Sequence, residues 1–140
     1  MARKSAERAA DRADMIAWLF ENSCDLMHVA KDGIFRLVNP AWCELTGLRA
    51  DQLIGRSQVD FYHPDDHAGM RHRIATMKPG ESSENEVRIR RADGTYQWFA
   101  ARGQRMADGS FIVTLRDATQ ERAHREELDA ARRTRKALGA

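Results

Sequence analysis

The sequence predicts an α+β fold: a five-stranded antiparallel sheet with short helices on one face, flanked by an N-terminal and a C-terminal amphipathic helix. Two observations predict this arrangement. In the middle of the chain, short β-like runs are separated by turns that contain glycine, and a segment divided by proline and glycine lies among them. Both ends of the chain lack proline and are rich in Ala, Arg and Glu, residues that favour helix.

The first part of the predicted sheet is a hairpin. Its β-like runs cover residues 26–31 and 34–39, and Asp32 and Gly33 between them have the composition of a two-residue turn. Because glycine adopts positive φ angles without steric cost, this turn can reverse the chain tightly. The two runs are therefore expected to pair with each other.

Three short helices are predicted after this hairpin. Asn39 is expected to cap the first one, since Asn side chains accept hydrogen bonds from free N–H groups at a helix start, and Gly47 ends it. The second helix covers residues 49–55. The third begins at residues 63–66, where two carboxylates favour the positive end of the helix dipole, and it ends at residues 78–80.

Three further strands complete the predicted sheet. Residues 86–90 alternate between charged and apolar side chains, which places Val87 and Ile89 on the core side. Turns that contain glycine then lead into residues 95–106 and 110–116. Short antiparallel connections place all five strands in one sheet, with the helical segment covering one face.

Length and composition restrict the classes of function. The chain has 140 residues and a formal net charge of +2, which fits one domain and lacks the basic excess expected of a nucleic-acid binder. No apolar run reaches the roughly 18 to 20 residues that a membrane span needs, and no secretory signal is present. Cys24 and Cys43 cannot form a disulfide framework. The sequence therefore predicts a cytoplasmic protein with no membrane span and no nucleic-acid partner.

The two ends predict a homodimer. Small or apolar residues recur there at spacings of three and four, as in the seam of a short coiled coil, although a solvated helix without a partner is the alternative. The expected seam residues are Ala9, Ala13, Ile16, Phe20, Leu128, Ala131 and Leu138. The chain thus divides into a dimerisation helix over residues 1–19, a core domain over residues 20–119 and a coiled-coil helix over residues 120–140.

Six segments of the core match those of a known family. They cover residues 32–42, 45–47, 53–57, 61–66, 91–99 and 115–119. With these segments, residues 20–119 resemble a PAS domain of the bacterial sensory type, as found in sensor histidine kinases. The resemblance implies a sensor that responds to a ligand, light, redox state or partner and passes its state to an effector through the terminal helices.

The resemblance further implies the input module of a histidine kinase in a two-component system, working with an effector domain or partner kinase. Cyclases, phosphodiesterases and transcription factors are alternative outputs. The chain itself is not expected to be an enzyme, because it shows no motif that joins a nucleophile to a base and no phosphate-binding glycine loop. A ligand-free protein-interaction module and a haem-dependent gas sensor are the other two hypotheses.

A cavity between the sheet and the third short helix is the candidate ligand site. It is expected to be mostly apolar and to suit a small hydrophobic ligand, unless side chains fill it completely. Its expected lining residues are Met27, Val29, Phe35, Leu37, His67, Met70, Ile74, Trp98, Val113 and Leu115. For Trp98, packing in the core or under a flanking helix is the alternative to a ligand contact.

No cofactor and no metal site are expected, although a haem or another small ligand stays open. The resemblance makes His67 a candidate haem ligand, with a capping or surface histidine as the alternative. His63, His67 and His72 have a spacing similar to that of a zinc site, but His63 is expected at the helix cap. Photosensory flavin-binding members carry Asn-Cys-Arg-Phe where residues 57–60 are Ser-Gln-Val-Asp, so cysteinyl–flavin chemistry is not expected, whereas non-covalent flavin stays open.

The junction between the last strand and the last helix is the candidate signal relay. Thr119 is expected to cap the helix, with Glu121 in its first turn. The resemblance implies that Asp117 and Thr119 couple the sheet to this helix, whose angle or register against a second protomer would then carry the signal.

Overall fold

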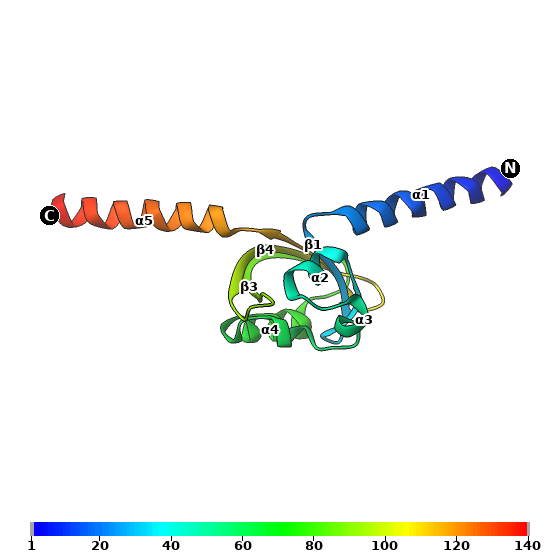
Figure 1. The fold of residues 1–140 in the computed structure, drawn as a ribbon, viewed down its shortest axis with the longest axis horizontal. Helices are drawn as coiled ribbons and strands as arrows, with labels where there is room; N and C mark the ends of the chain where they lie inside the picture. Colours follow the sequence, from blue (N-terminus) through cyan, green and yellow to red (C-terminus); the bar gives the residue numbers. More distant parts are fainter. Residues whose placement is uncertain (1, 140) are drawn as a thin grey trace.

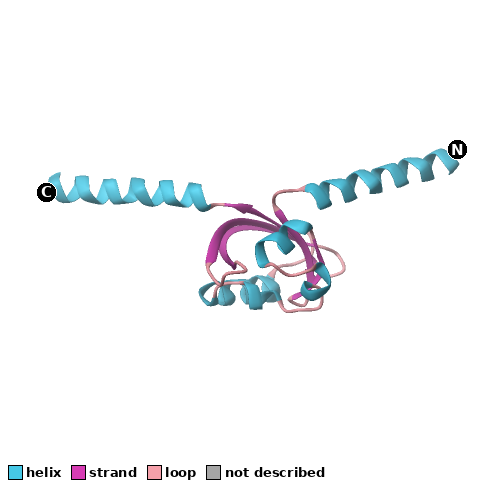
Figure 2. Ribbon diagram, in the orientation of Figure 1, coloured by secondary structure: helices cyan, strands magenta, loops and turns pink. Residues whose placement is uncertain are grey.

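A five-stranded antiparallel sheet with the strand order β2-β1-β5-β4-β3 forms the centre of the molecule. The structure is a computed structural model and describes residues 2–139. The short helices lie against one face of the curved sheet, whereas the two long terminal helices point away from it in opposite directions (Figure 1). Figure 2 shows the same arrangement by secondary structure. The predicted α+β class and the five-stranded sheet with flanking helices are confirmed.

The elements are close to the predicted ones, with two differences. A short 3₁₀ helix at Gln58–Phe61 was not predicted, and the third strand begins at Ser82. The elements in chain order are α1 (Ala2–Asn22), β1 (Leu26–Lys31), β2 (Ile34–Val38), α2 (Pro40–Thr46), α3 (Ala50–Leu53), η1 (Gln58–Phe61), η2 (Pro64–Asp66), α4 (His67–Thr76), β3 (Ser82–Arg90), β4 (Tyr96–Arg105), β5 (Phe111–Asp117) and α5 (Thr119–Gly139). Within residues 2–139, no helix has both the length and the apolar character that crossing a membrane requires.

The core fills the space between the inner face of the sheet and the short helices. Val87 and Ile89 belong to it, as their alternation predicts. Trp42 and Phe35 are its largest fully buried side chains, and their ring centroids lie 5.0 Å apart in an edge-to-face arrangement. Such pairs add to the free energy of area burial.

The face of strand β1 that points into the core is the opposite of the predicted one. Leu26, His28 and Ala30 are buried, whereas Met27 and Val29 lie on the outer face and are only partly covered. Apolar residues occupy both faces of this strand, so hydropathy alone does not select between them. The predicted contribution of Met27 and Val29 to the cavity is therefore wrong.

Leu37 is likewise wrongly predicted as an inner residue, because it is 46% exposed. The register of β2 shifts between Val29 and Ala30 of its partner strand, which pairs Leu37 with Val29 and Phe35 with Ala30. Since directly paired residues share a face, the shift leaves Phe35 inside and Leu37 outside.

Asn39 occupies the N-cap position of α2, but its side chain does not make the predicted capping hydrogen bond. Its fully buried side chain accepts a hydrogen bond at Oδ1 from the N–H of Met27 at 3.0 Å. Its Nδ2 group donates to the carbonyl oxygens of Phe20 at 3.2 Å and Asp25 at 2.9 Å. The Asn39 N–H also donates to the Met27 carbonyl at 3.1 Å. One residue thus joins the end of α1, the start of β1 and the entrance to α2.

We predict that Asn39→Ala lowers the free energy of unfolding by about 2 to 3 kcal/mol, because it leaves buried backbone groups without partners. Urea unfolding followed by tryptophan fluorescence measures this loss. Asn22→Ala is the matched control: Asn22 is exposed and donates only to the Trp18 carbonyl, so the expected change stays within about 0.5 kcal/mol. Equal losses in the two variants would contradict the role of Asn39.

Candidate functional site

A cavity of about 50 Å³ lies between α4 and the inner face of β3, β4 and β5. Met70, Ile74 and Val113, three of the expected lining residues, line it. Phe35 and Leu115 are buried in the core beside it but do not line it. The cavity therefore lies between α4 and the sheet, as the sequence predicts, but most of its lining residues differ from the expected ones.

Part of the lining of this cavity is polar. Its polar lining residues are Gln58, Arg73, Ser83 and Asn85. None of them was expected from the sequence. Two could have been found, because Ser83 and Asn85 extend upstream the alternation that marks Val87 and Ile89 as inward-facing. Gln58 lies in the unpredicted 3₁₀ helix, so no periodicity identifies it.

His67 does not line the cavity. Its Nε2–H donates to the Tyr62 carbonyl at 2.9 Å, which ties the start of α4 to the preceding loop. His63 accepts the N–H of Asp65 at Nδ1 over 3.1 Å, so it stands at the cap as expected. The residues present do not fit a haem, because the cavity is small and the His67 ring nitrogen is engaged elsewhere. Among residues 2–139, no group of three His, Cys, Asp or Glu side chains is arranged to hold a metal ion.

His28 is a buried polar residue that the sequence analysis missed. Its ring packs edge-on against Phe35 and Trp42, with centroids 5.1 and 5.3 Å away, and its Nε2 lies 3.2 Å from Oε1 of Gln58. Burial lowers the pKa of His28 to about 4, against a smaller opposing effect of the Gln58 hydrogen bond. The imidazole is therefore neutral at pH 7, and Gln58 connects it to the cavity.

Trp98 lies on the outer face of the sheet, under α5, and not in the cavity. The guanidinium carbon of Arg122 is 3.5 Å from the centre of one of its rings, and that of Arg88 is 4.6 Å away. Cation–π contacts of this kind hold a helix against an aromatic face. Of the two alternatives to a ligand contact, packing under the flanking helix is the one that the structure shows.

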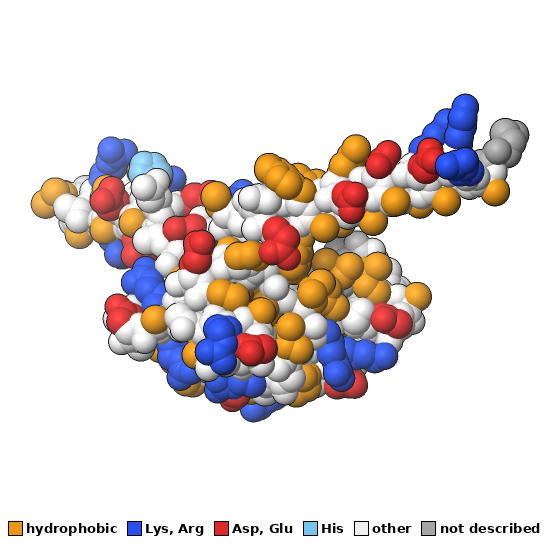
Figure 3. Space-filling view, turned by 45° about the vertical axis from the view of Figure 1, so that its right-hand side comes forward, with side chains coloured by type: hydrophobic (Ala, Val, Ile, Leu, Met, Phe, Trp, Pro, Cys, Tyr) orange, Lys and Arg blue, Asp and Glu red, His pale blue; other side chains and the backbone are white. Residues whose placement is uncertain are grey.

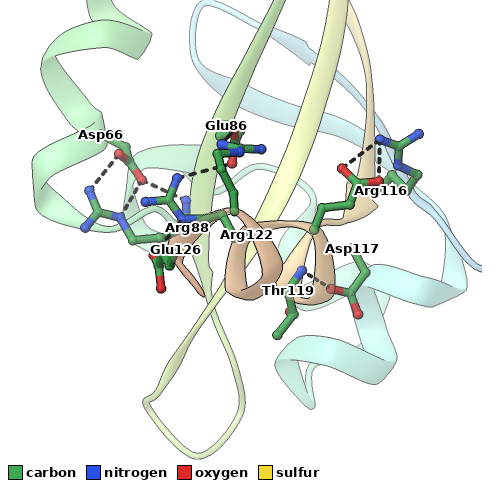
Figure 4. A network of polar contacts seen from close by, with 10 residues as sticks. Asp66, Glu86, Arg88, Arg116, Asp117, Thr119, Arg122 and Glu126 are labelled. Carbon is green, nitrogen blue, oxygen red and sulfur yellow. Dashed lines mark hydrogen bonds and ion pairs between the residues drawn. The ribbon is translucent and has the colours of Figure 1, made fainter. Parts of the chain in front are cut away.

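Glu86 of β3 fastens the first turns of α5 to the sheet. It accepts a hydrogen bond from Nη1 of Arg125 at 2.6 Å. It accepts another from Nη1 of Arg122 at 3.2 Å (Figure 4). These bonds, that of Arg125 first, lower the pKa of the Glu86 carboxyl. The docking of α5 therefore combines one carboxylate, two guanidinium groups and the indole of Trp98.

Asp66, at the end of η2, links α4 to the same strand. Its carboxylate accepts from the backbone N–H of Arg88 at 2.7 Å and from Nη2 of that side chain at 2.9 Å (Figure 4). The hydrogen bond to Asp66, followed by the attraction of its charge, raises the pKa of Arg88. Because Arg88 also contacts Trp98, a continuous path runs from the start of α4 through Asp66, Arg88 and Trp98 to Arg122 of α5.

The expected relay residues stand at the joint of β5 and α5, where Asp117 takes the capping role that was expected of Thr119. Asp117 accepts the N–H of Thr119 at Oδ1 over 2.9 Å, so the carboxylate and not the Thr119 hydroxyl supplies the acceptor at the helix start (Figure 4). Hydrogen bonds from Thr119 and, to a lesser extent, Gln97 lower the pKa of Asp117. The N–H of Ala118 donates to the Trp98 carbonyl at 3.0 Å, which attaches the joint to β4.

The expected seam residues lie on exposed helix surface. Ile16 and Leu128 are 59% and 45% exposed, and Phe20 is the one member that is partly covered. The apolar surface of α1 is wider than expected, because Met15, Trp18 and Leu19 are exposed as well. Figure 3 shows hydrophobic side chains along this helix, among charged ones. No residue of α1 (Ala2–Asn22) is fully buried.

Known proteins share this fold. The family model of the PAS fold matches residues 19–118, and no curated protein matches the chain significantly. The PAS domain of an HTR-like protein from Haloarcula marismortui is 24% identical, with a TM-score of 0.71 over 82% of this chain and 98% of that one. A domain of a sensory box sensor histidine kinase/response regulator from Geobacter sulfurreducens is 22% identical, with a TM-score of 0.64 over 76% and 94%. An RNA-binding light-oxygen-voltage receptor is 20% identical, with a TM-score of 0.76 over 94% of this chain and 40% of that one.

We predict that the free energy of unfolding falls as the pH decreases from about 6.5 towards 4. The pKa of His28 is about 4 in the folded chain and has its ordinary value of 6.5 in the unfolded one, so protons bind the unfolded state first. At 1.36 kcal/mol per pKa unit, protonation of this residue removes about 3 kcal/mol at most.

Urea midpoints measured across this pH range test the prediction. His28→Leu removes the titrating group and is expected to flatten the pH dependence. His72→Gln changes an exposed histidine of α4 and is expected to leave the dependence as it is. If His28→Leu keeps the slope of the unmodified protein, His28 is not its source.

Proposed function

The chain belongs to the PAS family, and on that basis we propose that it is the sensory input module of a cytoplasmic histidine kinase and works as a homodimer. In this proposal, residues 20–119 respond to a small ligand or to a partner. Residues 1–19 contribute to dimerisation, and residues 120–140 carry the signal to the effector. A PAS domain is a sensory module, so the chemistry belongs to the effector.

The docking of α5 is the observation that carries this proposal. Glu86, Trp98 and Arg122 fix the first turns of the helix to the sheet, whereas the rest of α5 is exposed. A change at the sheet therefore alters the direction of the whole helix. Such a change of helix angle is a population shift between two arrangements and requires no reaction in this domain.

The path through Asp66 supports a signal that begins in the cavity. Met70 and Ile74 of α4 line the cavity, and Asp66 immediately before α4 holds Arg88. A ligand that displaces α4 would therefore pull on Arg88 and, through Trp98, on α5. The sheet separates the cavity from α5, and this path connects them around its β3 edge.

The exposed apolar residues of α1 support the dimer. Met15, Ile16, Trp18 and Leu19 are each 59–65% exposed, and large contiguous apolar surface of this kind marks protein interfaces. A second chain placed along the seam would cover part of it. The exposed seam residues of α5 extend the same interface in the proposal.

A ligand-free interaction module is the second candidate, and the outer face of the sheet favours it. Leu37 and Ile112 are 46% and 45% exposed on this face. A partner protein bound there would reach α5 without using the cavity. A chain that dimerises and signals but binds no small molecule would support this candidate.

We predict that Ile16→Asp shifts the chain from dimer to monomer, because it places a carboxylate in the expected apolar seam. Light scattering on the 140-residue chain across a concentration series measures the shift. Ala10→Asp is the matched control: it adds the same charge about a quarter turn away from the seam on the same exposed helix, and should leave the dimer intact. A monomeric unmodified chain would contradict the dimer.

We predict that Asp117→Ala changes the output of the intact protein about fivefold, because a lost helix-start acceptor is worth about 1 kcal/mol. Autophosphorylation of the intact protein is the measurement in the histidine kinase proposal. Asp108→Ala is the matched control, since Asp108 accepts the N–H of Ser110 at 2.9 Å in the same way at a turn remote from α5. An Asp117→Ala protein with unchanged output would rule out this coupling.

A further inference from the structure

We propose that the cavity between α4 and the sheet binds a short-chain aliphatic monocarboxylate, with Arg73 as the counter-charge of the carboxylate. This inference rests on the proposed sensory function and names the chemical class of its ligand. It follows from the charge of Arg73, from the hydrogen-bond donors that line the cavity, and from the small size and apolar lining residues of the cavity.

Arg73 is a partly buried guanidinium without a carboxylate partner. It lines the cavity, and within residues 2–139 its side chain makes no hydrogen bond and no ion pair. Desolvation lowers the pKa of Arg73 against smaller opposing effects of Tyr62 and Asp66, and the Asp66 carboxylate is already held by Arg88. Arg122 and Arg125, by contrast, share Glu86. A partly buried cation without a counter-charge is costly, and an anion in the cavity would relieve that cost.

Three other residues that line the cavity add hydrogen-bond donors. Gln58 is only 5% exposed, and its Oε1 accepts from His28, which leaves its amide N–H groups for the cavity. Ser83 and Asn85 also line the cavity, and their side chains have no hydrogen-bond partner within residues 2–139. A carboxylate offers acceptors only, so it matches a wall that combines a guanidinium with amide and hydroxyl donors.

The remaining walls select a short alkyl group. Met70, Ile74, Phe111 and Val113 are apolar, and they leave no partner for a second charged group on the ligand. The volume of about 50 Å³ holds on the order of four water-sized groups. Acetate and propionate are of this size.

Calorimetric titration of the 140-residue chain tests the proposal with propionate and with propionamide, its neutral isostere. We expect propionate to bind at least tenfold more tightly than propionamide. Arg73→Gln should weaken propionate at least tenfold and leave propionamide unchanged. Arg71→Gln is the matched control, because Arg71 lies on the exposed side of the same helix and its substitution removes the same charge.

Thermal unfolding gives a second measurement that does not depend on weak heats. Arg73→Met replaces the unpaired cation by an apolar side chain, so the ligand-free variant should unfold at a higher temperature than the unmodified chain. Propionate should raise the unfolding temperature of the unmodified chain and of Arg71→Gln, but not that of Arg73→Met.

The possible outcomes separate this inference from the proposed function. If propionate and propionamide bind equally and Arg73→Gln changes neither affinity, the proposal of a carboxylate ligand is wrong. The domain would then be a sensor of small neutral molecules. If neither propionate nor propionamide binds at millimolar concentration, the proposal of a carboxylate ligand is also wrong. In both cases the dimer and Asp117 measurements still decide the proposed function, since neither uses the cavity.

Discussion

The hydrogen bonds of the Asn39 side chain fix the position of β1 and, through it, the inward face of the sheet. Asn39 is fully buried, and each of its side-chain bonds goes to the backbone of a neighbouring segment. Both backbone groups of Met27 are bound to it, so the start of β1 has a single position relative to α2. Because β1 lies between β2 and β5, its position fixes which residues of the sheet face inward.

The inward face of β1 determines the polarity of the cavity. With Leu26 and Ala30 inside, His28 is inside as well, where burial keeps it neutral and its ring holds Gln58. Gln58 then presents its amide to the cavity. A shift of β1 by one residue would bury Met27 and Val29, and the cavity would lose this polar group.

The sequence predicts the order of elements because local chemistry decides it. Glycine-containing turns end the strands, and the alternation around Val87 and Ile89 marks one face without ambiguity. The orientation of β1 is not local, since Met27 and Val29 are as apolar as Leu26 and Ala30. It depends on Asn39, whose preference for a helix cap yields to bonds with distant segments.

The position of Trp98 is equally non-local, because its partner Arg122 follows in another element. Arg73 escapes prediction because an arginine on a short helix is usually solvated.

Helix α4 is the element at which ligand recognition and signal transmission meet in the proposed mechanism. An anion in the cavity changes an equilibrium only by the difference in its free energy of binding between two arrangements. Arg73 concentrates that difference on α4, because it is a charged lining residue of the cavity and belongs to this helix. The start of the same helix follows Asp66, which holds Arg88 against Trp98 beneath α5. A ligand bound to the sheet alone would stabilise the domain without favouring one position of α4. Neutralisation of Arg73 acts on the helix itself, and therefore on the path that ends at α5.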